Sequence, residues 1–416
     1  MNIPFADRLS SLLKTDTKYV FSSGSWLVLS ETVAILSSFA LSVFLAKILS
    51  RESYGTYKYF FSIFGMLNVT TLAGMSTAVS QAVANGNDSA VFSGLKIKMK
   101  FGFAGLFFGL VLSAYYFIMG RPDLASIVFL ISFFVPFFDP LGVYWPFLQG
   151  KTRFDLIFKY EAPLNLLSTV FLISLSSWSG QVVVVILGYL SFWTLARLLI
   201  FILSTRNIKN DSKINGDSSS LLSNGLHLSA VRVIDSVGSY ADKVILWSFL
   251  GPAAVALYSV ALSIPSRLGV VSKIISNLAF PKMAKQDYST LAGTYSRKMI
   301  QAGSVSFVLA VFYIITASLI FGLIYPTYPD GVALSKLAAL KSIFILPGTI
   351  LATAFVAHTR KKELYSLRVS SVIFYLMLLS SLTYFFGVWG AILAGVVSAV
   401  FDMILAFILA KIFVSH

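Results

Sequence analysis

The sequence predicts an all-α protein that crosses a membrane many times, and three observations lead to this fold class. Of the 416 residues, 57% are hydrophobic, only 12% are charged, and the mean hydropathy is +0.83. Apolar runs of about 20 residues recur along the chain, the length that an α-helix needs to cross a hydrocarbon layer of about 30 Å. These runs lack the alternation of apolar and polar residues that is typical of membrane β-strands.

Twelve such runs are expected to form transmembrane helices. They lie near residues 21–46, 57–84, 101–119, 125–148, 158–177, 181–204, 222–249, 253–280, 299–324, 334–357, 367–386 and 388–411. Five prolines fall inside them and predict kinks, because neighbouring helices can satisfy the freed carbonyl groups. These prolines are Pro136, Pro140, Pro163, Pro265 and Pro347.

The distribution of Lys and Arg orients these spans. With a cytoplasmic N-terminus, the inner segments carry 21 basic residues, among them Lys98, and the outer loops carry six, among them Lys58 and Lys341. Cytoplasmic loops are enriched in Lys and Arg, so we expect both termini in the cytoplasm. The net charge of +15 then reflects topology and indicates no nucleic-acid partner. The first 20 residues carry charges throughout and predict no cleaved signal peptide.

An internal repeat divides the chain into two halves. At an offset of 201 residues, Ser22 falls on Ser223, Gly24 on Gly225 and Tyr57 on Tyr258, and near 208 the stretch FLQGKTRFDL (147–156) meets FVAHTRKKEL (355–364). Six spans per half imply parallel repeats, which are typical of transporters. We therefore expect two six-helix bundles around a central cavity. The predicted segments are a cytoplasmic N-terminal segment (1–20), the first bundle (21–204), a cytoplasmic linker (205–221), the second bundle (222–411) and a tail (412–416).

Several stretches resemble a known exporter family. AKILSRESYGTYKYFFSIFGMLNVTTLAGM (46–75), its counterpart ADKVILWSFLGPAAVALYSVALSIPSRLG (241–269), FLQGKTRFD (147–155) and YFFGVWGAILAGVVSAV (384–400) are similar to the polysaccharide-biosynthesis flippases. These belong to the multidrug/oligosaccharidyl-lipid/polysaccharide exporter superfamily. The resemblance implies a protein of the bacterial inner membrane that moves polyprenyl-diphosphate-linked oligosaccharide, an O-antigen or capsule repeat unit, by alternating access. The partners that it implies are this cargo, membrane lipids, a coupling H⁺ or Na⁺, and other polysaccharide-assembly membrane proteins.

Ionisable residues inside the spans are candidates for function, because an unpaired charge is costly in hydrocarbon. The seventh span is richest, with a polar face that includes Arg232 and Lys243 and is flanked by Asp235 and Asp242. This helix is expected to line a hydrated cavity. Adjacent residues on a helix point about 100° apart, so we expect Asp242 and Lys243 to find partners elsewhere and not to pair with each other.

Arg and Lys bind phosphate oxygens, and the cargo carries a diphosphate. Its candidate ligands are Arg232 and Arg267, followed by Lys243, Lys273 and Arg197. Candidate sites for a coupling ion are Glu31, Asp139, Asp235, Asp242 and Asp402. A structural pair between Arg232 and Asp235, and snorkelling of Arg197 and Lys273 to the headgroups, are the competing interpretations. Tyr144 and Trp145 are candidates for stacking on sugars, against ordinary packing.

Two other functions remain open. A drug or cation antiporter of the same superfamily would need a cavity dominated by acids, whereas acids and bases are balanced in the spans. An integral-membrane polymerase or acyltransferase would need catalytic residues in an exposed loop. The three histidines, His227, His358 and His416, form no metal or acid–base constellation, and the chain has no cysteine. We therefore expect no enzymatic activity, no metal and no cofactor.

Overall fold

The computed structural model describes residues 17–208, 218–269, 288–358 and 360–412, and every regular element in these ranges is a helix. Long apolar runs form helices in a membrane because a helix satisfies its own backbone hydrogen bonds there. The chain divides into two compact units. The first comprises Met1–Ile48 and Phe64–Val233, and the second comprises Leu49–Ile63 and Ile234–His416.

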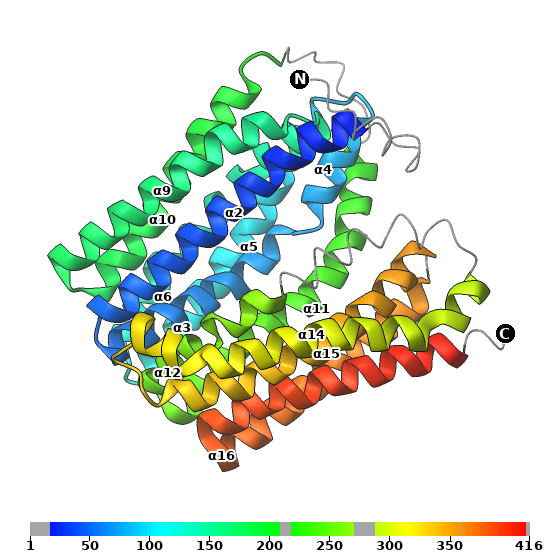
Figure 1. Ribbon diagram of the computed structural model, residues 1–416. Helices are drawn as coiled ribbons and strands as arrows, with labels where there is room; N and C mark the ends of the chain where they lie inside the picture. Colours follow the sequence, from blue (N-terminus) through cyan, green and yellow to red (C-terminus); the bar gives the residue numbers. More distant parts are fainter. Residues whose placement is uncertain (1–16, 209–217, 270–287, 359, 413–416) are drawn as a thin grey trace. The chain divides into compact units, whose positions relative to one another are not determined.

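The N-terminal part of the chain carries the first set of helices. They are α2 (Thr17–Ile48), α3 (Arg51–Asn68), η1 (Val69–Thr71), α4 (Met75–Ala84), α5 (Ala90–Ile118), α6 (Pro122–Ser132), α7 (Val135–Phe138), η2 (Pro140–Val143), α8 (Tyr144–Gly150), α9 (Phe154–Ser179) and α10 (Val182–Thr205). Helices α2 and α9 pack along each other, and α10 lies beside α9 (Figure 1). Apolar side chains from α4, α5, α8 and α10 form the core of this unit, which includes Met75, Val79, Val91, Val143 and Ile200.

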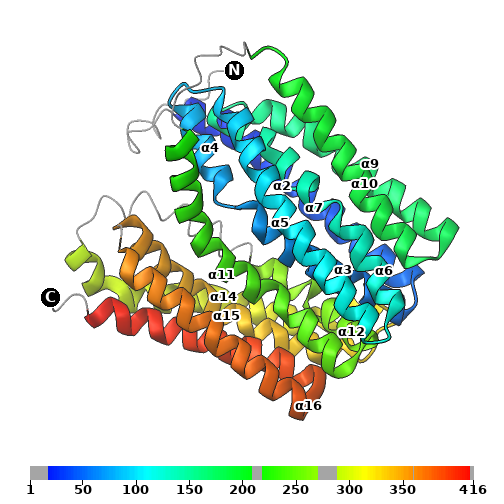
Figure 2. The same cartoon turned by 180° about the vertical axis from the view of Figure 1, so that it is seen from behind.

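The C-terminal part carries the second set. They are α11 (Ser218–Leu250), α12 (Pro252–Ser263), α14 (Tyr288–Ile324), α15 (Gly331–Ala357) and α16 (Lys361–Ile412). Helices α14, α15 and α16 run side by side, as both views show (Figures 1 and 2). The first half of α3 also packs here: a Cβ on Gly55 would lie 1.8 Å from the carbonyl oxygen of Pro252, so only glycine permits this contact with α12.

The sequence predicts two spans at 367–386 and 388–411, and α16 contains both. Gly387 has φ 58° and ψ −137°, a conformation that breaks the helix there. The rings of Phe374 and Phe401 stack with centroids 4.1 Å apart. Along the sequence, these two residues are nearly equidistant from Gly387. The two parts of α16 therefore fold back on each other as an antiparallel hairpin.

Two spans of the first half are broken within the membrane. The second span bends by 49° between Arg51–Thr71 and Met75–Ala84, and Leu72 at the break has φ 60°. The fourth span, Pro122–Gly150, is interrupted at η2, which begins with Pro140. Proline lacks the N–H that continues a helix, so the predicted kink at Pro140 occurs as a break.

Length and composition identify eight spans among the described residues, or nine when the bent pair counts as one. Lys362–Lys411 is one of the eight and contains both arms of the α16 hairpin. The charged helix α11 and the short helix α12 are not among the eight. The chain is therefore an all-α polytopic membrane protein, as predicted. The two compact units are defined by which residues pack together, and this does not test where a segment of the sequence begins or ends. The segment boundaries predicted from the sequence therefore stay predictions.

Helices α8 and α15 end in the same kind of turn. After α8, the N–H of Lys151 donates to Phe147 and that of Arg153 to Leu148. After α15, the N–H of His358 donates to Ala354 and that of Arg360 to Phe355. The two turns are related by an offset of 207 residues, one residue less than the offset of 208 expected from the sequence. The ends of α4 and α5 have the same hydrogen-bond pattern, so this turn is a common helix end and does not by itself fix the register of the repeat.

Candidate functional site

Three basic side chains come together in the second unit: Lys58 from α3, Lys243 from α11, and Arg267, which follows α12. Lys58 lies close enough to Lys243 and Arg267 for their positive charges to repel its own. All three residues are half-buried. The Lys58 ammonium also lies over the ring of Tyr54, 5.1 Å from its centroid. We call Lys58, Lys243 and Arg267 the basic cluster.

Lys243 also pairs with its neighbour in the sequence, which corrects the prediction that adjacent residues would not pair. Its Nζ lies 3.0 Å and 3.2 Å from the two carboxylate oxygens of Asp242. The backbone N–H of Lys243 donates to the same carboxylate at 2.7 Å. The two Cβ atoms diverge around the helix, but the four methylenes of lysine are long enough to bend back. Asp242 is buried, 7% exposed, and therefore depends on this pairing.

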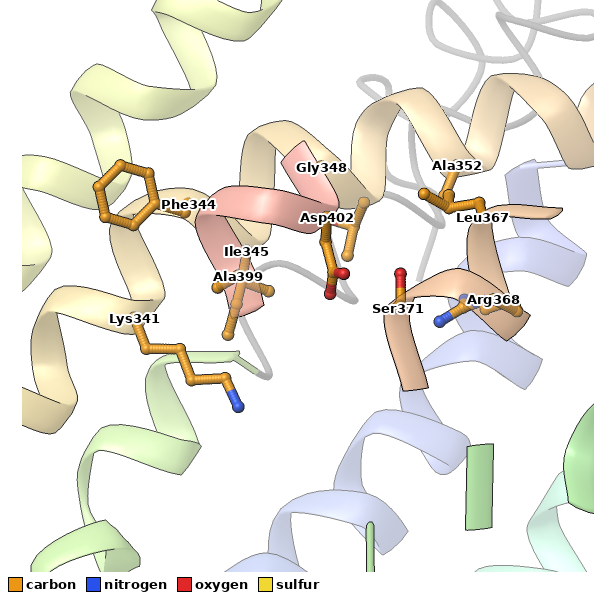
Figure 3. Close-up of a pocket in the computed structure, with 11 residues that line it drawn as sticks. Lys341, Phe344, Ile345, Gly348, Ala352, Leu367, Arg368, Ser371, Ala399 and Asp402 are labelled. Atoms are coloured by element: carbon orange, nitrogen blue, oxygen red, sulfur yellow. The ribbon is translucent and has the colours of Figure 1, made fainter. Parts of the chain in front are cut away.

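A cavity of about 480 Å³ lies inside the second unit. Residues of α11, α12, α15 and both arms of α16 line it, and their polar members are Asp235, Ser239, Asp242, Tyr258, Lys341, Arg368, Ser371, Tyr375, Ser398 and Asp402. We call this space the second-unit cavity. A smaller pocket of about 210 Å³ shares Lys341, Arg368 and Asp402 with it, and Figure 3 shows their side chains in that pocket. Residues of α11 thus line a polar cavity, which lies within the second unit, whereas the sequence led us to expect a central cavity between two bundles.

Hydrogen bonds and ion pairs connect several of these side chains. Asp235 lies 3.6 Å from the guanidinium of Arg368. The phenol of Tyr258 hydrogen-bonds with Asp242 and with Tyr375. Asp402 hydrogen-bonds with Ser371, while its Oδ1 is buried and has no hydrogen-bond partner in the described part of the chain. The network brings together three of the five predicted acids, Asp235, Asp242 and Asp402.

The fourth predicted acid, Asp139, lies in the first unit. Its carboxylate accepts a hydrogen bond from Thr71 and pairs with Lys98, with 2.9 Å between Lys98 Nζ and Asp139 Oδ2. Lys98 is 2% exposed and also donates to Ser76 at 3.3 Å. Asp139 lies at the break before η2, and Thr71 at the break after η1. This pairing therefore links the breaks of the second and fourth spans.

Arg197 also acts within the first unit. Its Nη1 donates to the carbonyl of Phe138 at 2.6 Å, and its guanidinium lies 4.2 Å from the centroid of the Phe138 ring. In an uninterrupted helix the N–H of Gly142 would donate to that carbonyl, but it donates to Asp139 instead. The Arg197 side chain thus satisfies a carbonyl that the helix break leaves open.

The remaining predicted site residues are dispersed. Arg232 and Glu31 are exposed, and Asp235 pairs with Arg368, whereas the sequence suggested Arg232 as its partner. Lys273 lies outside the described residues. The Tyr144 ring is 1% exposed and its hydroxyl hydrogen-bonds to Glu161, so packing occupies it. Trp145 is half-buried.

Sequence reasoning missed four basic residues because it placed them in loops. Lys58 lies within α3, Lys98 within α5, Lys341 within α15, and Arg368 within α16. For Lys58, Lys341 and Arg368 the signal was present, since the predicted spans 57–84, 334–357 and 367–386 already contain them. A basic residue near the end of a span fits the positive-inside rule whether it lies in a loop or is buried in a helix. Counting Lys and Arg residues therefore does not distinguish a loop position from a buried one.

Comparison with known proteins agrees with this fold. Residues 20–287 match the polysaccharide biosynthesis protein family. No match was found among the curated proteins.

Similar solved structures include two of named function. One is the lipid II flippase MurJ in an inward closed conformation, with 14% sequence identity and a TM-score of 0.70 over 92% of this chain and 87% of that chain. Another is an inward-facing multidrug resistance MATE family transporter of the MOP superfamily. It has 13% sequence identity and a TM-score of 0.67 over 94% of this chain and 98% of that chain.

A third similar structure is a MOP superfamily transporter from Pyrococcus furiosus, described as having a binding pocket of reverse polarity. It shares 15% identity and a TM-score of 0.60, with 96% of each chain covered. At such identities these likenesses define the fold, whereas the family match covers more than half of the chain. The chain therefore belongs to the polysaccharide biosynthesis protein family and has the fold of MOP superfamily transporters.

Proposed function

We propose that this protein is a flippase that moves a polyprenyl-diphosphate-linked oligosaccharide, an O-antigen or capsule repeat unit, across the bacterial inner membrane by alternating access. Both termini are cytoplasmic in this proposal, as the distribution of Lys and Arg indicates. The observation that supports it best is the basic cluster. Three positive side chains, from α3, α11 and the residues after α12, lie close enough for Lys243 and Arg267 to repel Lys58, and an anion that binds them relieves this repulsion.

A diphosphate fits the basic cluster chemically. Arg267 can donate two parallel hydrogen bonds to phosphate oxygens, and the ammonium groups of Lys58 and Lys243 act as compact point charges beside them. Lys243 belongs to the cluster and pairs with Asp242, which lines the second-unit cavity, so this ion pair connects the cluster with the cavity. No covalent bond forms or breaks in this process, and other polysaccharide-assembly proteins would supply and consume the cargo.

The second-unit cavity is the proposed site of coupling to a cation gradient. It gathers Asp235 and Asp242 from α11 with Asp402 from the second arm of α16, and carboxylates can take up a proton or bind a cation. Asp139 fits this role less well, because Lys98 and Thr71 already engage it.

The same acids favour a second candidate, a drug or cation antiporter. The lining of the second-unit cavity contains three carboxylates against the two bases Lys341 and Arg368, which suits a cationic cargo better than an anionic one. The basic cluster contradicts this alternative. Efflux measurements with cationic drugs in cells that overproduce the protein separate the two functions.

The decisive experiment replaces the basic cluster in a strain that lacks its own copy of the protein. We expect Lys58→Gln and Arg267→Gln each to reduce surface polysaccharide roughly 10- to 100-fold, because each removes a charged hydrogen bond to the diphosphate. The lipid-linked intermediate should then accumulate in the cytoplasmic leaflet. Arg121→Gln, in an exposed position outside the cluster, is the matched control. Normal polymer from the Lys58→Gln/Arg267→Gln double variant would exclude the proposed diphosphate site.

A further inference from the structure

Lys341 projects its ammonium group into the interior of the second unit. It lies ten residues after the start of α15 at Gly331, which places it about 15 Å along the helix, near the middle of the span. The side chain extends toward the space in which Asp402 and Arg368 also end (Figure 3). Its stem passes Gly395, where a Cβ would lie in ordinary van der Waals contact, 3.7 Å from the lysine Cδ and Nζ.

The ammonium of Lys341 faces two carboxylates from different segments. Asp242 on α11 and Asp402 on the second arm of α16 both attract it electrostatically. Within the described ranges it forms no ion pair shorter than 4.0 Å, and its nearest described aromatic partner is Tyr375, with 5.9 Å from Nζ to the ring centroid. Lys341 is therefore a positive charge placed between two acids without being committed to either.

Among the described residues, two of the three acids of the cavity are paired with a base, and the third is not. Asp235 pairs with Arg368 and Asp242 with Lys243. Asp402 has a buried oxygen without a hydrogen-bond partner in the described chain, and Lys341 and Arg368 supply the nearby positive charge. The described residues also include no group of three or more acids or histidines arranged to hold a metal ion.

We propose that the ammonium of Lys341 holds the position that an exchangeable metal cation would take between Asp242 and Asp402, so that the second-unit cavity excludes Na⁺. This inference deepens the proposed function, because it concerns the cation that would be coupled to transport. It rests on the proposed function for that coupling role alone, and the exclusion of Na⁺ from the cavity does not depend on it. A sodium ion would have to displace a charge that is covalently attached to α15, and the cavity would then carry an excess of positive charge. A lysine ammonium is a compact point charge on a flexible stem, which suits it to replace a small cation.

The proton is the small cation that this arrangement can still exchange. Asp402 can accept a proton on its unpartnered Oδ1, or Lys341 can release one, without displacement of the lysine. The ionisable groups that face Lys341 are Asp235, Asp242 and Lys243 on α11, Tyr258 on α12, Arg368 and Tyr375 on the first arm of α16, and Asp402 on the second arm.

The test measures cation binding by the purified full-length protein and needs no cargo. Thermal unfolding is recorded in Na⁺ and in choline at about 0.15 M ionic strength and mildly alkaline pH, where carboxylates are ionised. The wild-type midpoint should be the same in both salts. Lys341→Gln uncovers the two acids, and Na⁺ should then raise its midpoint by about 2 °C or more. Adding Asp402→Asn to this variant should abolish the rise.

Two further variants serve as controls. Lys341→Arg keeps the tethered charge and should be as indifferent to Na⁺ as the wild type. If Lys341→Gln does not fold, Lys341→Met removes the same charge and takes its place in the comparison. Lys336→Gln, on the same helix but outside the cavity lining, should also be indifferent.

Saturable stabilisation of the wild type or of Lys341→Arg by Na⁺ would overturn the proposal. So would a properly folded Lys341→Gln variant that does not respond to Na⁺. A failure of the flippase proposal would leave these unfolding results intact, because they do not involve a lipid-linked oligosaccharide.

Discussion

The two units use their buried charges differently, although the sequence repeat relates them. In the first unit, Lys98 and Asp139 form a direct pair that links two helix breaks, and Arg197 satisfies the carbonyl of Phe138 beside one of them. In the second unit, Lys341 has no ion pair shorter than 4.0 Å with a described residue and lines a cavity. A broken helix in a membrane needs polar partners for its freed backbone groups, so the first unit's charges serve structure. The second unit's buried charges line a cavity instead.

The largest expected effect is on the stability of the first unit. Lys98→Met leaves the Asp139 carboxylate without its counter-charge, and we expect a loss of about 3 kcal/mol, since breaking a buried ion pair from one side is strongly destabilising. Denaturant unfolding of the purified protein measures it. The double variant Lys98→Met/Asp139→Leu removes both charges and should recover much of the loss. If it is no more stable than Lys98→Met, the pair does not hold the two breaks together.

Close helix contacts offer a second comparison. Gly55→Ala in the second unit would place a Cβ 1.8 Å from the backbone oxygen of Pro252, whereas Gly109→Ala in the first would meet the side-chain oxygen of Ser132 at 2.0 Å. The Ser132 hydroxyl can rotate away, but its Cβ, at 2.7 Å, must shift as well, whereas a backbone carbonyl in a helix can do neither without moving the helix. We expect Gly55→Ala to lose about 3 kcal/mol, at the upper end for overpacking, and Gly109→Ala about 1–2 kcal/mol. Unfolding midpoints rank them, and an equal loss would contradict this reason.

Substitutions of Arg197 and Lys58 test whether buried charges stabilise the fold in the first unit and serve transport in the second. Arg197→Gln should destabilise the protein by about 1–3 kcal/mol, because the Phe138 carbonyl loses its donor. Surface polysaccharide per folded molecule should stay normal. Lys58→Gln should show the opposite result, with little change in stability and reduced polymer. An Arg197→Gln variant of normal stability that loses transport would instead support the sequence-based assignment of Arg197 to the diphosphate.

The smallest effects are expected at the repeated turn. Arg153 pairs with Asp155 in the first half, and Arg360 with Glu363 in the second. Both arginines are substantially exposed, but the Glu363 side chain is 5% exposed, whereas that of Asp155 is 31% exposed. An exposed ion pair contributes 0 to about 1 kcal/mol, so Arg153→Ala should shift the unfolding midpoint slightly. Arg360→Ala should shift it more, because it leaves a buried carboxylate without this partner. Equal shifts would count against this explanation.

Particular residues show what the sequence could predict and what it could not. The break between two spans at Gly387 was expected, as was the polar character of α11. The pairing of Asp242 with Lys243 was excluded wrongly, because divergence of two Cβ atoms does not limit a side chain as long as lysine. Arg232 was ranked first among the diphosphate residues and is exposed, while Lys58, placed in a loop, joins Arg267 and Lys243.

The sequence by itself determined that this chain is an all-α membrane protein with two related halves, because the thickness of hydrocarbon imposes a length and a composition on each span. Only the tertiary structure decided which charges meet. Lys341 faces Asp242 and Asp402 from about 60 to 100 positions away in the chain, a separation over which helical periodicity carries no information. The rotation of each helix about its axis is set by packing, and that rotation determines whether a charge closes a helix break or lines a cavity.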